Sequence, residues 1–323
     1  MATTFSNNKR VLITGANGTV GRHLVRFLAT RGFCPVQAVR SAQSEVTAGY
    51  PVLVTGDLSA QETSELDLTT CGKIHAVVHL AGVSSHASEE LLATNIVGTR
   101  QLANAAGVAG IERFVFVSTA LVHEIGKITD RESGQAVPLT PYAQSKLGAE
   151  RALLEGKHTF DVIIVRSPPI LHRKATGSIG LLMKALALGI PLPFGSVTEN
   201  RIDFVSIGVL CDFLATCIMH PAAAGKTFNV SDGMPLSTRE LLERLAAMTG
   251  QRTRMVSIPV PVLRKLLGVV SARLASRLLG DSLLDISLAA NALGWSPAIE
   301  HCISAMNHPF SGPLSHAKKG NWD

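Results

Sequence analysis

VLITGANGTVGRHL, residues 11–24, joins a short apolar strand to the start of a helix through a run of glycines. The glycines are Gly15, Gly18 and Gly21, spaced GxxGxxG, and apolar residues at helical spacing follow them. Gly15 suits a tight turn, Gly18 a close approach of backbone to a pyrophosphate, and Gly21 the packing of helix on sheet. The start of such a helix offers free N–H groups to phosphate. The spacing alone also fits a plain turn, but its place between a first strand and a helix predicts dinucleotide binding.

The rest of the first half alternates strands with helices. Val- and Ile-rich runs that predict buried strands lie at 35–40, 52–58, 75–82, 113–119 and 161–167. After residue 171 we expect a helix and a Pro/Gly loop in 177–195, strands in 201–207 and 227–233, a helix at 208–220 and a capped helix at 237–250. The sequence therefore predicts an α/β fold, a Rossmann-type doubly wound parallel sheet with a smaller, mixed C-terminal substrate lobe. We assign 1–171 plus 202–233 to the NAD(P)-binding domain and 172–201 plus 234–323 to the lobe.

Composition and charge exclude several classes of protein. The 323 residues are 46% hydrophobic and 17% charged, which is typical of a packed globular protein. The net charge of +6 forms no long basic run and aromatic residues are 5%, so we expect no nucleic-acid partner and a small anionic ligand instead. The five cysteines include no CxxC and the histidines no HExxH pair, so we expect reduced thiols and no metal. Without a signal-like N-terminus or a long apolar run, we expect a cytoplasmic protein with no transmembrane segment.

Tyr142 and Lys146 form the pattern YxxxK. On a helix these two positions share one face. A neighbouring ammonium lowers the pKa of a phenol, which would make Tyr142 a usable general acid and base. Upstream, Ser118 and Thr119 end a predicted strand, and such strand ends face the ligand crevice of a doubly wound sheet. Their hydroxyls are candidates to hydrogen-bond a substrate carbonyl or alcohol, although a hydroxyl there also fits a backbone cap.

Together these motifs resemble the extended short-chain dehydrogenase/reductases of the NAD-dependent epimerase/dehydratase family. TGANGTVG at 14–21 is similar to the family's glycine turn, GDL at 56–58 to its adenine-contacting turn, HLAG at 79–82 to the strand end that lines the cofactor, and NIVGTRQL at 95–102 to its NxxGTxxL. LPFGS at 192–196 and LGWSP at 293–297 are similar to members that act on UDP-sugars. The resemblance covers essentially the whole chain. It also implies dimerisation through helices of the cofactor domain, one of which would carry Tyr142.

The resemblance assigns roles to individual positions. It implies that Tyr142, Lys146, Thr119 and Ser118 are catalytic. The cofactor-binding set would be Gly15, Asn17, Gly18, Thr19, Val20, Gly21, Arg22, Arg40, Asp57, Leu58, Leu80, Ala81, Gly82, Asn95, Tyr142, Lys146 and Pro168. The substrate-binding set would be Ser84, Thr119, Tyr142 and Arg201.

The sequence also departs from the family pattern. The family's VYG tripeptide is replaced by Val122-His123-Glu124. The arginine that grips a sugar-nucleotide diphosphate would stand at Ile202, and Arg201 is one place early. Arg40 ends the second strand where NAD-binding relatives usually place an acidic residue. With help from Arg22, it favours NADP(H) over NAD(H), although an arginine there also fits stacking on adenine.

These features imply hydride transfer at a secondary alcohol or ketone. Ala120 and Leu121 stand where a dehydratase has its acid pair, which argues against elimination. Our main expectation is a reductase of a nucleotide-activated (UDP-) 4-keto-sugar. A UDP-sugar 4-epimerase that retains NAD is the alternative, and a reductase or dehydrogenase of a hydrophobic ketone or sterol-like alcohol is a further one. The basic, apolar segment 261–280 would then either form a lid over the substrate cleft or touch a membrane. A non-catalytic NAD(P) sensor is disfavoured by the Tyr142, Lys146 and Thr119 set.

Overall fold

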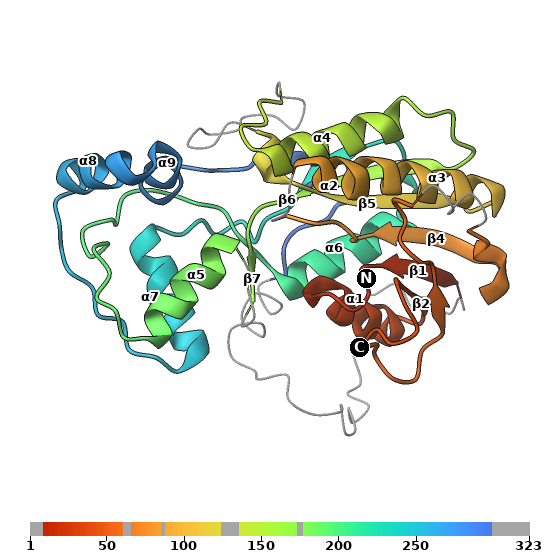
Figure 1. Ribbon diagram of the computed structural model, residues 1–323, viewed down its shortest axis with the longest axis horizontal. Helices are drawn as coiled ribbons and strands as arrows, with labels where there is room; N and C mark the ends of the chain where they lie inside the picture. The colour runs from red at the N-terminus through yellow and green to blue at the C-terminus, as the bar shows by residue number, and fades with distance from the viewer. Residues whose placement is uncertain (1–8, 61–65, 85–87, 124–135, 173–176, 299–323) are drawn as a thin grey trace.

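A parallel sheet organises the larger part of the molecule (Figure 1). The computed structural model describes residues 9–60, 66–84, 88–123, 136–172 and 177–298. Within them, seven parallel strands lie in the order β3-β2-β1-β4-β5-β6-β9. Their bounds are β1 Arg10–Thr14, β2 Cys34–Val39, β3 Val52–Val54, β4 Ile74–His79, β5 Arg113–Thr119, β6 Asp161–Ser167 and β9 Thr227–Asn229. The order reverses between β1 and β4, so a ligand crevice is expected at the carboxyl ends of these strands.

Helices cover both faces of the sheet, as a doubly wound fold requires. Helices α1 (Thr19–Thr30), α6 (Ile207–Met219) and α10 (Ser287–Leu293) lie on one face. Helices α3 (Gly98–Val108) and α4 (Pro141–Leu154) lie on the other, where α2 (Ser88–Leu92) and a π-helical turn at Ala93–Val97 lead into α3 (Figure 1). Successive side chains of a strand point to opposite faces of the sheet. In β1, Val11 and Ile13 therefore pack in the core under α1, and Leu12 packs in the core under α3. The predicted fold class is confirmed.

The core on the α1 face is closed by the C-terminal part of the described chain. Trp295, which follows α10, packs its ring against Phe213 of α6 with centroids 4.6 Å apart. Its indole N–H donates to Asp212 Oδ2 at 2.9 Å. Residues separated by some 80 positions in sequence therefore complete one hydrophobic cluster.

A second hydrophobic cluster lies beside the sheet domain. Helices α5 (Gly177–Ala187), α7 (Thr238–Thr249), α8 (Val260–Val270) and α9 (Ala272–Leu279) surround it, and β7 (Ile170–Leu171) pairs with β8 (Val205–Ser206) at its base. The predicted capping box is present: Ser237 and Glu240 exchange hydrogen bonds at the start of α7, which ends at the left-handed Gly250. The proposed domain boundaries stay a prediction.

Several predicted strands were too long, among them 75–82, which ends at His79, and 227–233, which ends at Asn229. The run at 52–58 forms a strand only over Val52–Val54, because the chain turns at Gly56, whose φ is +67°. The run at 201–207 forms only β8, and Ile202 makes isolated bridges to Leu236 and Ser282 instead. Among the described residues, no helix is long and apolar enough to cross a membrane. Glu124 and the tail from Pro309 lie outside the described residues.

Candidate active site

The glycine turn between β1 and α1 leaves helix N–H groups open. Gly15 has φ +67°, and a Cβ on it would lie 2.9 Å from the Ala81 nitrogen of the neighbouring strand end. A Cβ on Gly21 would overlap the Gly15 carbonyl oxygen. Gly18 is the N-cap of α1 and has no side chain to bond the first turn. The first-turn N–H groups of α1 are therefore presented without a side-chain cap, as a phosphate site requires.

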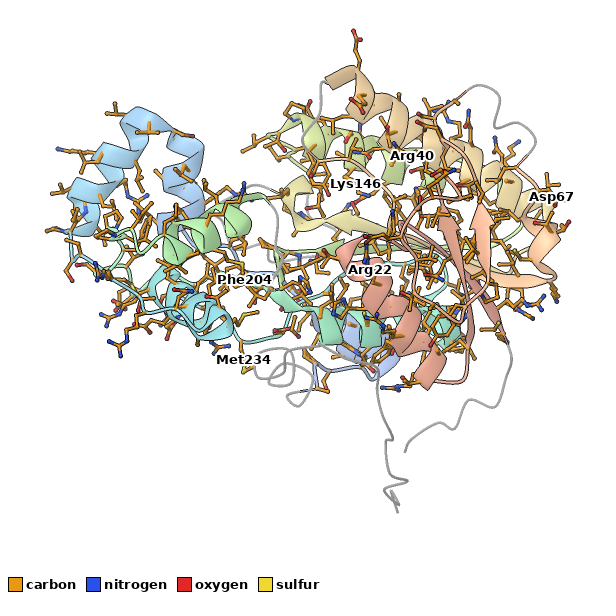
Figure 2. The ribbon with its side chains drawn as sticks, turned by 60° about the horizontal axis from the view of Figure 1, so that its bottom comes forward. Arg22, Arg40, Asp67, Lys146, Phe204 and Met234 are labelled. Carbon is orange, nitrogen blue, oxygen red and sulfur yellow. The ribbon has the colours of Figure 1, made fainter. Side chains whose placement is uncertain are left out.

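Arg22 lies on α1 (Figure 2), and its guanidinium makes hydrogen bonds to other residues of the protein. It donates through Nη2 to Glu45 Oε2 and through Nε to Asn17 O, both at 2.7 Å. Arg40 follows the last residue of β2 and is exposed. Asp57 accepts from the Ser59 backbone N–H and hydroxyl, and these bonds lower the pKa of its carboxyl, with a smaller effect from Arg40. An ionised Asp57 thus stands in the turn that was predicted to contact adenine.

A buried histidine links the strand ends to the π-helical turn. Thr99 Oγ1 donates to Asn95 O at 2.6 Å and so accepts from His79 Nε2 at 2.9 Å. That fixes His79 Nδ1 as the acceptor for Thr14 Oγ1, 2.6 Å away. Burial lowers the pKa of His79 to about 3, so the ring is neutral. These hydrogen bonds connect Thr14 of β1, His79 of β4 and the backbone of Asn95.

Asn95 links the end of β4 to the helix that carries Lys146. Its side-chain amide exchanges two hydrogen bonds with the Val83 backbone and donates a third to Ser145 Oγ, all at 2.9 Å. A Cβ on Gly82 would lie 3.0 Å from Asn95 Oδ1 and 3.9 Å from Lys146 Nζ. The backbone at Gly82 therefore lies against Asn95 and Lys146, which are 13 and 64 residues away from it in the sequence.

Lys146 points from α4 into the protein (Figure 2). Thr140 caps α4 and Pro141 occupies its first turn, so Tyr142 and Lys146 stand one turn apart. Lys146 Nζ lies 4.0 Å from the centroid of the Phe116 ring. Burial lowers the pKa of Lys146 to about 7, although the charge of Glu150 opposes the shift. Burial raises the pKa of Tyr142, opposite to the direction we expected from the sequence, because loss of solvent disfavours the charged phenolate.

This lysine should give the nucleotide-free protein a distinctive pH dependence. Between pH 7 and 10.5 the folded chain releases the Lys146 proton while the unfolded chain keeps it. Stability therefore rises with pH across that window, by about 1.4 kcal/mol per unit at most. We expect the thermal midpoint of the wild type to increase from pH 7 to 9 relative to that of Lys146→Met. Parallel pH profiles for the two proteins would show that the lysine is not perturbed.

The Ser118 hydroxyl is hydrogen-bonded to one member of a buried ion pair. Its hydroxyl donates to Glu150 Oε1 at 2.5 Å. Glu150 also pairs with Arg166, Nη2 to Oε2 at 2.7 Å, and the two side chains are 2% and 10% exposed. Thr119 Oγ1 accepts from the Leu121 N–H and keeps its own proton to donate. Of these two hydroxyls, that of Thr119 is therefore the one that still has a proton to donate among the described residues.

An apolar cavity opens beyond the ends of β5 and β6. Residues that follow these strands line the cavity together with residues of α5, α7 and α9. Ile202 and Phe204, which precede β8, also line it. Arg277 of α9 is its one guanidinium among the described residues, and no carboxylate there pairs with it. Burial lowers the pKa of Arg277. His123, also in the wall, is buried with no described partner for Nδ1. A half-buried cation in apolar walls favours an anionic ligand.

The structure places the other predicted residues as follows. Pro168 is buried and lines the cavity. Leu58 packs near Gly98, and Ser84 is exposed. Arg201 is exposed, lies outside the cavity wall and donates through Nη1 to the carbonyls of Thr198 and Asn200. Sequence reasoning missed Arg277 and the pair Glu150–Arg166. Glu150 follows Lys146 by one turn, and this was the one available signal.

Comparisons with known proteins give the sequences and structures that this chain is similar to. The model of the NAD dependent epimerase/dehydratase family matches residues 11–231. The UDP-glucose 4-epimerase of Vibrio cholerae is 32% identical over 302 residues, 90% of this chain and 91% of that protein. The 2-alkyl-3-oxoalkanoate reductase of Stenotrophomonas maltophilia is 25% identical over 253 residues, 75% and 76% of the two chains. The crystal structure of Bordetella bronchiseptica WbmG in complex with NAD and UDP has a TM-score of 0.69 at 22% identity and covers 90% of each chain.

Proposed function

Because the chain belongs to the NAD dependent epimerase/dehydratase family, we propose that it is an NAD-retaining 4-epimerase of a UDP-sugar. The observation that carries the proposal is the buried Lys146 beside Gly82 and Asn95, one turn after Tyr142. The similarity to a UDP-glucose 4-epimerase over nine-tenths of both chains supports the sugar-nucleotide substrate. The epimerase, our alternative from the sequence, is therefore better supported than the 4-keto-sugar reductase that we expected first.

The residues fit a nicotinamide dinucleotide. The uncapped N–H groups of α1 suit its pyrophosphate, the Asp57 turn its adenine, and the Gly82 backbone a close approach of its ring. When bound, the dinucleotide supplies an acceptor and a donor of hydride. Of the two arginines that predicted NADP(H), Arg22 is paired with Glu45, which leaves only Arg40 to meet a 2′-phosphate. We therefore propose NAD.

The chain's own residues would handle the proton. Tyr142 takes the proton of the sugar 4-hydroxyl and returns it to the same oxygen after the other face of the ring is presented. Lys146 holds the nicotinamide ribose, and its charge favours the phenolate of Tyr142 once substrate fills the site. Thr119 donates a hydrogen bond to the reacting oxygen, since its own oxygen already accepts from Leu121. Arg277 pairs with the diphosphate of the substrate, whereas the sequence had placed Arg201 in the substrate-binding set.

A reductase is the second candidate. The apolar cavity walls and the cation Arg277 also suit a ketone that combines an anionic group with an apolar body. The similarity to 2-alkyl-3-oxoalkanoate reductase supports this candidate over three-quarters of the chain. Such an enzyme, like a 4-keto-sugar reductase, exchanges its nucleotide in every cycle.

Nucleotide retention separates these functions. We expect freshly purified protein, once denatured, to release stoichiometric NAD that mass spectrometry identifies, and to interconvert UDP-glucose or UDP-N-acetylglucosamine with its 4-epimer. Protein that arrives empty or carries NADP(H) would contradict the epimerase. Ketones would then be assayed with added NADPH, and oxidation of NADPH would identify a reductase.

A further inference from the structure

Helix α8 carries an apolar stripe that no described part of the protein covers. Val262, Leu266 and Val269 are spaced i, i+4 and i+7, so they share one face, and Val270 adjoins them. They are 49%, 55%, 90% and 77% exposed. Single apolar residues at a surface are common, but a continuous stripe of four on one helix face indicates a binding surface.

The stripe is held on a packed helix. Leu263 of α8 is buried in the second hydrophobic cluster, and Val260 and Leu267 pack against it from the same side. Arg264 donates to the Leu279 carbonyl at the end of α9, which ties the two helices together. The helix therefore presents one apolar side to the core and a second one to the outside, and the outer side needs a separate explanation.

The positive charge around α8 indicates what kind of partner covers the apolar stripe. Residues 251–280 contain six Arg or Lys and no Asp or Glu, so this segment alone accounts for the net charge of +6 of the whole chain. Lys265 is exposed next to the stripe, and Arg252 and Arg254 are exposed on the loop before α8. A second copy of this chain would bring an equally basic segment, and the two would repel. Apolar residues flanked only by cations match an interfacial helix on an anionic lipid surface.

We propose that the outer face of α8 docks on an anionic phospholipid bilayer, with the helix lying in the plane of the interface. Helices α8 and α9 form the end of the molecule farthest from β1 and β2 (Figure 1), so the sheet domain would not obstruct contact with a flat surface. Helix α9 also contributes Leu274 and Arg277 to the wall of the substrate cavity. A bilayer on α8 would therefore lie next to the helix that lines the substrate site.

Vesicle flotation of the full chain tests the docking. We expect the wild type to float with vesicles of phosphatidylcholine mixed with phosphatidylglycerol and to remain unbound with phosphatidylcholine alone. Leu266→Gln/Val269→Gln keeps the charge and the helix propensity but removes two apolar contacts, and should weaken partitioning about tenfold or more. Val108→Gln is the matched control, since Val108 is 91% exposed in the last turn of α3 and should leave partitioning unchanged. Lys265→Gln should weaken it about fivefold.

Three further measurements make the result decisive. Thermal melting and nucleotide content of the double variant should equal those of the wild type, because both positions are exposed. Absence of wild-type binding to the anionic vesicles, or equal binding of wild type and double variant, would overturn the proposal. Sedimentation velocity that shows a wild-type dimer dissociated by Leu266→Gln/Val269→Gln would also overturn it, since a second copy would then cover the stripe.

Discussion

Tyr142→Phe should abolish turnover and leave the nucleotide in place. The change removes only a hydroxyl, so the helix and the Lys146 environment persist, while the group that gives and takes the proton is lost. Positioned general acid–base groups contribute about 10²–10⁴-fold to rates, so we expect kcat to fall by about a thousandfold. The measurements are turnover of the UDP-sugar substrate and the amount of dinucleotide that denatured protein releases.

The chain supplies its own control for this change. It has two tyrosines, and the other, Tyr50, packs at the margin of the α1-side core. Tyr50→Phe should keep wild-type turnover. Retained activity in Tyr142→Phe would refute the mechanism, and loss of the nucleotide in that variant would assign Tyr142 a binding role instead.

Arg277→Gln should raise KM about a hundredfold with little change in kcat. In the proposed complex the guanidinium makes charge-assisted hydrogen bonds to the substrate diphosphate in an apolar cavity. Losing such a contact costs about 2–3 kcal/mol, and this binding is used equally in ground and transition states. Steady-state kinetics with the UDP-sugar gives both constants.

Arg201→Gln is the matched control for Arg277. Its guanidinium is exposed and, among the described residues, donates to the carbonyls of Thr198 and Asn200, so KM should stay within about twofold of the wild type, in line with typical surface substitutions. The reverse result, a large effect at Arg201 and none at Arg277, would restore our sequence-based assignment and remove Arg277 from the substrate site.

The sheet domain could be predicted closely because its signals are local. The strands at 113–119 and 161–167 have the predicted bounds, since continuous Val and Ile runs fit only a strand that is buried on both faces. The helix at 237–250 was marked by its capping box and terminal glycine. The prediction of one strand at 201–207 was wrong because its residues pair with different partners. Ile202 makes isolated bridges to Leu236 and Ser282, and only Val205–Ser206 forms a strand.

The candidate site was predictable only where a motif encodes it. The glycine turn and the Tyr142–Lys146 spacing depend on positions close in sequence. Arg277 reaches the cavity through the packing of α9 on the second cluster, which no local pattern shows. The Glu150–Arg166 pair joins α4 to β6. The direction of the Tyr142 pKa shift depends on how much solvent the folded protein excludes, and this is a property of the assembled site.

The ring contact between Trp295 and Phe213 affects when the core can close during synthesis of the chain. Synthesis delivers every strand of the described sheet by Asn229, yet the core under α1 stays open until Trp295 arrives. The second cluster likewise waits for Leu279. A nascent chain on the ribosome therefore carries its complete glycine turn and Tyr142–Lys146 pair beside two unfinished cores. Domains usually fold as units, the N-terminal one first, but here residues near the end of the described chain close the core under α1. A chain truncated before Trp295 is therefore expected to expose part of the core under α1.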